Sequence, residues 1–125
     1  MTVEPAQLLG AAERMLSSAL PEGSAHWPRT CALLTRLALE SALDRYWSRV
    51  LPSAARCSMR PQLLLLPRYA GDEAATLARE AWLGLSRAAH HHAYELAPTA
   101  GELREWHSEV RRLVDLLHRA RENRG

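Results

Sequence analysis

Apolar residues recur at helical spacing in long segments of this chain, and the first two segments end at clear breaks. The first segment covers about residues 5–20, from a proline suited to a first helical turn to the break Pro21-Glu22-Gly23. The second runs from near Pro28 to Pro52. One of its stripes, at spacings of four, three and four, consists of Leu39, Leu43, Tyr46 and Val50. The apolar sector of this segment is broad, so we expect a central helix that contacts two or more neighbours.

Residues 53–71 form a connector between the second and third long segments. The connector contains four consecutive leucines at 63–66, bracketed by Pro61 and Pro67. We expect a short helical turn pressed onto the core here, with an oligomer contact as the alternative.

Two further amphipathic helices complete the pattern. The third begins near Asp72 and carries one apolar face: Ala74, Ala78, Trp82, Leu85 and Ala89. The opposite side of this helix carries Thr76, Glu80, Leu83 and Arg87. After Pro98, the residues Thr99-Ala100-Gly101-Glu102 are typical of a capping box that opens the fourth helix. Its stripe consists of Leu103, Trp106, Val110, Leu113, Leu117 and Ala120. The pattern predicts an all-α fold, a four- to five-helix up-and-down bundle that forms one domain over residues 1–125.

Composition supports the helical prediction and excludes several classes of protein. Ala, Leu, Arg and Glu dominate, and the chain contains no Ile and no Phe. No run approaches membrane-spanning length, and the first residues lack the pattern of a secretory signal, so we expect a cytoplasmic protein without a membrane partner. Cys31 and Cys57 are too few for a disulfide framework and lack metal-ligand spacing.

Basic residues are distributed unevenly. The net charge is only +2, which by itself does not indicate nucleic-acid binding, but residues 45–71 hold five arginines and no acidic residue. These arginines are Arg45, Arg49, Arg56, Arg60 and Arg68. They alternate with Tyr46, Trp47 and Tyr69, a mixture suited to phosphate contact and base stacking, so they are candidates for RNA binding. An ordinary solvated surface is the alternative.

The stretch SRAAHHHAY, residues 86–94, concentrates cationic and titratable groups. Adjacent histidines diverge around a helix and no other ligand pair sits at suitable spacing, so we expect no metal site here. His92 would point about 140° away from Arg87 on a continuous helix, so joint action requires the helix to end between them. Solvation at a helix C-terminus is the alternative role for His90 and His91, and a structural hydrogen bond is the alternative for His92.

The spacing Arg87-x4-His92-x-Tyr94 resembles the signature of the HEPN superfamily (higher eukaryotes and prokaryotes nucleotide-binding domains), which are small four- or five-helix bundles. The stretch RLALESAL, residues 36–43, resembles an earlier helix of many members. The resemblance implies a metal-independent endoribonuclease without cofactor, in which a homodimer places two copies of the motif at one composite site. It also implies a role as a toxin or phage-defence component.

The same resemblance implies a role for each matching residue. Arg87 would bind the scissile phosphate, and His92 would act as general acid and base on the ribose 2′-hydroxyl or the leaving oxygen. Tyr94 matches a tyrosine that a nucleotidyltransferase-type antitoxin can modify. Many active members have a polar residue directly after the arginine, where this chain has Ala88, so His90 or His91 would have to supply that group. The alternative is a non-catalytic HEPN-like helical dimer that binds a nucleotide or a protein partner.

Other chemically notable residues have simpler interpretations. Glu40 is an auxiliary candidate: it either forms an exposed pair with Arg36 or is a buried acid that needs a partner such as Arg36 or Arg87. The remaining histidines, at 26, 107 and 118, belong to no constellation and are expected at the surface. The four tryptophans are expected mainly as core or interface anchors.

Overall fold

The computed structural model describes residues 3–18, 27–89 and 96–124, the side chains of 121–124 excepted. Within these ranges the chain is helical and contains no strand, which confirms the all-α prediction. The helices are α1 (Pro5–Ser17), α2 (Trp27–Val50), α3 (Pro52–Ala55), α4 (Met59–Ala70), α5 (Asp72–Ala89) and α6 (Ala100–Arg124). No described helix is both long enough and apolar enough to cross a membrane.

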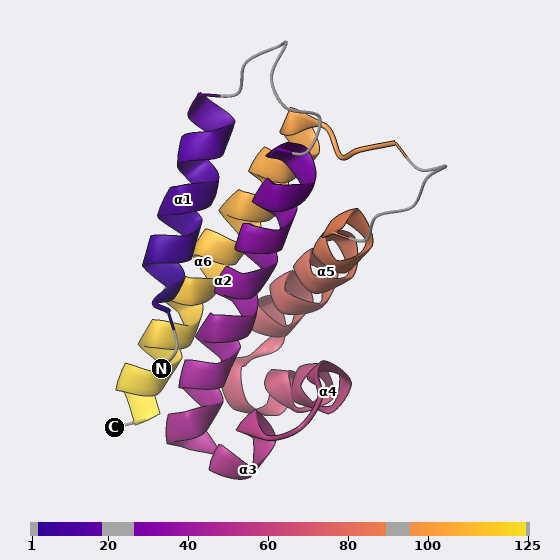
Figure 1. Ribbon diagram of the computed structural model, residues 1–125. Coiled ribbons are helices and arrows are strands. Elements are labelled where there is room, and N and C mark those ends of the chain that lie inside the picture. Colours follow the sequence, from indigo (N-terminus) through magenta and orange to yellow (C-terminus); the bar gives the residue numbers. More distant parts are fainter. Residues whose placement is uncertain (1–2, 19–26, 90–95, 125) are drawn as a thin grey trace.

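The four long helices α1, α2, α5 and α6 run alternately up and down to form a bundle (Figure 1). Helix α2 packs against α1, α5 and α6, which confirms its predicted central position. The short helices α3 and α4 lie at the end of the bundle where α2 finishes, and α4 is seen nearly end-on beside the start of α5 (Figure 1). The C-terminal end of α5, which carries Arg87, is therefore at the opposite end of the bundle from α4.

The core is formed by the stripes that the apolar periodicity predicts. Leu39, Leu43 and Trp47 of α2 are fully buried, and Leu85 of α5 and Val110 of α6 join them. Buried alanines line much of α5, so its backbone can approach α2 and α6 closely. Burial of this apolar surface is the main source of the bundle's stability.

Helix α4 corrects the prediction for the four leucines at 63–66, which lie in a 12-residue helix rather than in a short helical turn. Pro67 lies inside this helix and removes one backbone donor. The helix nevertheless continues to Ala70, and the residue before Pro67, Leu66, is fully buried. At the start of the helix, the Gln62 side chain donates from Nε2 to the Cys57 carbonyl oxygen at 2.8 Å. The helix ends at Ala70. The next residue, Gly71, has a φ of 93° that only glycine adopts readily, and α5 begins at Asp72.

The start of α6 confirms the predicted capping box. The Thr99 backbone N–H donates to Glu102 Oε1 at 2.9 Å, and the Glu102 N–H donates to Thr99 Oγ1 at 3.1 Å. Two backbone donors of the first turn, which have no partner inside the helix, are satisfied in this way. The described chain enters α6 at a defined position directly after Pro98.

Candidate functional site

Arg87 lies in the last turn of α5, on the outer face of the helix. Its side chain is exposed and forms no hydrogen bond or ion pair with another described residue. The described part of the helix reaches Ala89, so whether it stops before His92 lies outside the described residues. The remaining motif candidates, His90, His91, His92 and Tyr94, lie outside the described residues.

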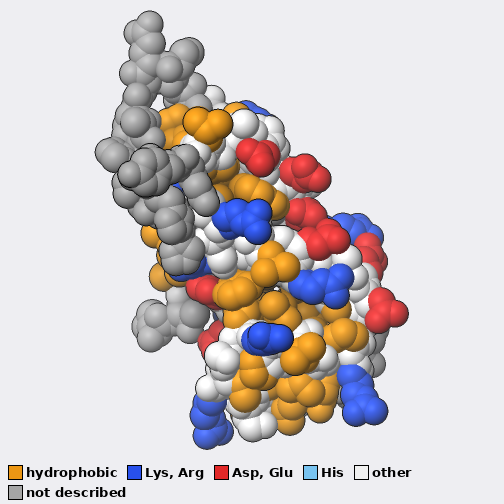
Figure 2. Space-filling view, turned by 90° about the vertical axis from the view of Figure 1, so that its right-hand side faces the viewer, with side chains coloured by type: hydrophobic (Ala, Val, Ile, Leu, Met, Phe, Trp, Pro, Cys, Tyr) orange, Lys and Arg blue, Asp and Glu red, His pale blue; other side chains and the backbone are white. Residues whose placement is uncertain are grey.

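Leu83 shares the outer face of α5 with Arg87, one turn earlier. Its side chain is 57% exposed, and Leu64 on the outer face of α4 is 75% exposed. Figure 2 shows this side of the molecule: hydrophobic side chains gather on its lower half with arginines among them, and acidic side chains follow one edge. The bundle thus presents an apolar surface that no described element covers.

Glu40 joins α2 to α5. Its Oε2 lies 3.8 Å from Arg36 Nε and 3.4 Å from the indole Nε1 of Trp82, which donates to it. The predicted pair with Arg36 is confirmed, although it is half-buried rather than exposed. One helical turn beyond Trp82, the buried Oγ of Ser86 has no hydrogen-bond partner among the described atoms. The bond between Glu40 and Trp82 therefore holds α5 against α2, in the half of α5 that also carries Arg87. Glu40 and Arg87 do not contact each other.

The five arginines proposed for RNA binding lie at the other end of the bundle from Arg87 (Figure 1). Three of them, Arg56, Arg60 and Arg68, are exposed on or beside the short helices. A rise of 1.5 Å per residue along α5 separates Asp72 from Arg87 by about 22 Å. A single-stranded RNA that contacts both Arg87 and these five arginines would have to extend over several nucleotides.

The aromatic residues among these arginines do not form a stacking surface. Tyr46 and Trp47 are buried, and their ring centroids are 5.2 Å apart in an edge-to-face arrangement. Trp47 makes the same kind of contact, also at 5.2 Å, with the half-buried Tyr69 of α4. The suggestion of base stacking is therefore wrong for Tyr46 and Trp47, and Trp47 is the core anchor expected of the tryptophans, because these rings hold α4 against α2.

An acidic groove lies between α5 and the first half of α6, where Trp106 is surrounded by four carboxylates. They belong to Glu80, Glu102, Glu105 and Glu109. Burial raises the pKa of Glu109, and the charges of Glu105 and then Glu80 raise it further. Within the described part of the chain, no group of three or more His, Cys, Asp or Glu side chains is arranged to hold a metal ion.

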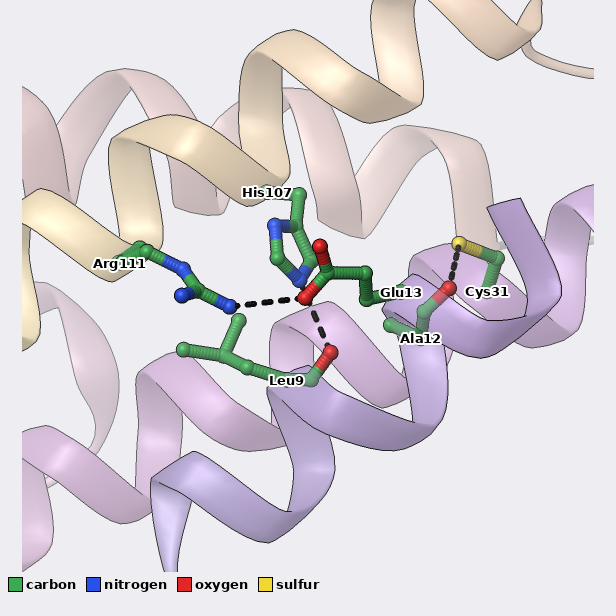
Figure 3. A network of polar contacts seen from close by, with 6 residues as sticks. All are labelled: Leu9, Ala12, Glu13, Cys31, His107 and Arg111. Carbon is green, nitrogen blue, oxygen red and sulfur yellow. Dashed lines mark hydrogen bonds and ion pairs between the residues drawn. The ribbon is translucent and has the colours of Figure 1, made fainter. Parts of the chain in front are cut away.

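His107 corrects the expectation of a surface residue, because its side chain is only 8% exposed. Its Nε2 lies 2.9 Å from the Leu9 carbonyl oxygen (Figure 3). Because a carbonyl only accepts, Nε2 carries the proton and donates. Beside it, Arg111 Nη2 donates to Glu13 Oε2 at 3.1 Å, so two side chains of α6 bind α1.

Cys31 belongs to the same polar layer and is inert rather than reactive. Its thiol is buried and donates to the Ala12 carbonyl oxygen at 3.7 Å (Figure 3). Burial raises the pKa of the Cys31 thiol, although a hydrogen bond with Thr35 and the charge of Arg104 act in the opposite direction. This layer is structural: it attaches α1 to α2 and α6. The burial of His107 could have been predicted from the sequence, since its spacing from Leu103 and Val110 places it on the apolar face of the helix.

Comparison with protein-family models, with curated proteins and with solved structures found no match to this chain.

Proposed function

We propose that this chain is a metal-independent endoribonuclease that acts as a homodimer, with Arg87 as the phosphate-binding group and His92 as the general acid and base. The observation that carries the proposal is the position of Arg87. Its guanidinium is exposed in the last turn of α5 and has no carboxylate partner among the described residues. An exposed arginine with no described counter-charge, close in sequence to three histidines, is suited to binding an RNA phosphate.

The proposed reaction uses the ribose 2′-hydroxyl as the nucleophile. His92 would accept the proton of this hydroxyl while its oxygen attacks the adjacent phosphorus, and a histidine would return a proton to the departing 5′-oxygen. Arg87 would stabilise the charge that develops on the non-bridging oxygens. In this scheme His90 or His91 supplies the second proton-transfer group, because the position after Arg87 is the apolar Ala88.

The apolar outer face of α5 supports a dimer close to this site. Leu83 is exposed one turn before Arg87, so a contact between two copies at Leu83 would bring both arginines to the same region. In this arrangement a Leu83→Glu substitution would separate the copies and stop cleavage, whereas Arg87→Ala would stop cleavage and leave the dimer intact.

Cleavage of single-stranded RNA in EDTA by purified protein tests the proposal. Wild type should cleave, and Arg87→Ala and His92→Ala should each lower the rate by about 100-fold or more. The matched control is Arg79→Ala, which removes another exposed arginine from the same helix and should leave the rate unchanged. Equal cleavage by wild type and Arg87→Ala, or no cleavage of varied RNAs by a clean wild-type dimer, would refute it.

The competing function is a non-catalytic helical module that binds a protein partner. The exposed Leu64 and Leu83 favour this function, because apolar surface of this kind is typical of interaction sites. In that case wild type would not cleave RNA, Leu64→Glu or Leu83→Glu would abolish partner binding, and Arg87→Ala would leave the oligomeric state unchanged. We favour the nuclease, because an interaction module gives no reason for an arginine, three histidines and a tyrosine within nine residues.

A further inference from the structure

A groove with a volume of about 300 Å³ lies between the start of α1, the second half of α2 and the second half of α6. This volume is at the lower end of the range of pockets that hold small organic ligands. The groove is at the end of the bundle opposite Arg87, so it is separate from the proposed nuclease site. The side chains that matter for its chemistry are Glu4, Arg45, Arg49, Val114, Leu117 and His118.

Two arginines give the groove a positive wall. Arg45 and Arg49 are four residues apart on α2 and therefore lie on the same face of the helix. Arg45 Nη2 is 3.3 Å from Glu4 Oε1, so this guanidinium is held in place and partly neutralised. Arg49 is exposed and forms no ion pair with a described carboxylate. The described lining thus includes one carboxylate and two guanidinium groups, an excess of positive charge among the described residues of the groove.

The facing wall of the groove is apolar. Leu117 is buried and Val114 is half-buried on α6, and the buried Ala42 of α2 completes this surface. His118, one residue after Leu117, also lines the groove. A ligand that fits both walls carries a compact anion at one end and an apolar body at the other.

We infer that this groove binds an organic phosphate monoester, with the phosphate between Arg45 and Arg49 and the apolar body against Val114 and Leu117. A phosphate group has three acceptor oxygens and up to two negative charges. It can therefore accept hydrogen bonds from two guanidinium groups at once, and it matches them better than a ligand with one carboxylate does. The ion pair with Glu4 orients the Arg45 guanidinium and partly neutralises it, so Arg49 would bind the phosphate most strongly. This inference assigns Arg45 and Arg49 to a small-molecule site and leaves Arg56, Arg60 and Arg68 as the RNA-binding candidates.

An NMR titration of the full-length protein with phenyl phosphate tests the inference. Resonances of Arg49, Val114 and Leu117 should shift and saturate, and benzoate should bind about tenfold more weakly than phenyl phosphate. Arg49→Gln should weaken phenyl phosphate binding by about tenfold or more. Ala6→Glu should do the same, because Ala6 is an exposed lining residue where a carboxylate would face the phosphate. Arg119→Gln, on the same helix as His118 but outside the groove, is the control that should bind as wild type.

Circular dichroism confirms that each variant is folded before the titration. No saturable shift with phenyl phosphate, or equal affinity for wild type and Arg49→Gln, would overturn the inference. Displacement of phenyl phosphate by a short single-stranded RNA with a 5′-hydroxyl would also overturn it, because the groove would then belong to an RNA surface. These outcomes do not depend on cleavage, so they remain distinct from failure of the nuclease proposal.

Discussion

Gly84 of α5 lies directly against the indole of Trp106 on α6. A Cβ added to Gly84 would be 2.6 Å from the indole Nε1 and 2.7 Å from the adjacent ring carbon, well inside van der Waals contact. A glycine in the middle of a helix ordinarily weakens it relative to alanine. Here it permits the close approach of the two helices that border the acidic groove.

Gly84→Ala should therefore destabilise the protein even though alanine is the better helix former. We expect a net loss of about 1 to 2 kcal/mol in the free energy of unfolding, because overpacking outweighs the gain in helix propensity. Gly10→Ala is the matched control in α1, where the added Cβ would meet only Arg14 Nη1 at 3.6 Å. Urea denaturation should show a gain of up to about 1 kcal/mol for this control. A stabilised Gly84→Ala variant would contradict the packing described for Trp106.

The capping box at the start of α6 predicts that two threonine-to-alanine substitutions differ in their effect on the free energy of unfolding. Thr99→Ala removes the hydroxyl that accepts from the Glu102 backbone N–H, so it should cost about 1 kcal/mol. Thr76→Ala, at an exposed position inside α5, should instead be neutral or slightly stabilising, because alanine has the higher helix propensity. Thermal unfolding of both variants measures the difference. Equal effects would mean that Thr99 does not act as a cap.

The raised pKa of Glu109 predicts that the stability of the folded protein depends on pH. Its folded-state pKa is raised above the ordinary 4.5, so the folded protein binds the proton more tightly than the unfolded chain. Stability should therefore fall as pH rises from 4.5 through the raised pKa, since the ionised carboxylate is unfavourable in the folded state. Glu109→Gln should melt at a higher temperature than wild type at pH 7, and the difference should disappear below pH 4.5.

Glu73→Gln is the control for this pH experiment. Glu73 Oε2 accepts from Arg112 Nε at 2.7 Å in an exposed ion pair, so its removal should give no gain in melting temperature at pH 7. A Glu109→Gln variant whose advantage grew as the pH fell would contradict the sign derived for Glu109.

Two histidines that look equivalent in the sequence should respond differently to substitution. His107→Ala leaves a cavity and removes the hydrogen bond to the Leu9 carbonyl, so we expect a loss of about 2 kcal/mol or more. His118→Ala, at an exposed position of the same helix, should change stability by no more than about 0.5 kcal/mol. Denaturant unfolding of both variants separates them, and equal losses would argue against the buried position of His107.

The long helices could be predicted because each has a strong local signal. The stripe of Leu39, Leu43 and Tyr46 is buried as the spacing indicates, and Thr99 and Glu102 form the expected cap. The extent of α4 could not be predicted, since Pro67 locally opposes a helix. Packing of Leu66 and the contact of Trp47 with Tyr69 outweigh that preference, and both depend on residues far apart in the chain.

The candidate site could be predicted only in part. The exposure of Arg87 follows from its place opposite the apolar stripe of α5, and the structure confirms it. The burial of Tyr46 and Trp47 follows from the apolar stripe of α2 and from the expectation that tryptophans are core anchors, whereas the mixture of Arg with Tyr and Trp in the sequence also allowed a stacking surface. The groove at Arg49 combines residues from three helices, so no local pattern contains it.

The central claim is that Arg87 and His92 act in one composite site shared by two subunits. Arg87→Ala and His92→Ala subunits carrying different affinity tags should be co-expressed and purified through both tags, and the initial rate of RNA cleavage in EDTA then measured. We predict that each variant alone is inactive and that the mixed dimer recovers a measurable part of the wild-type rate, because it retains one arginine and one histidine at the shared site. Full activity of the Arg87→Ala homodimer, or an inactive mixed dimer beside an active wild type, would contradict the claim.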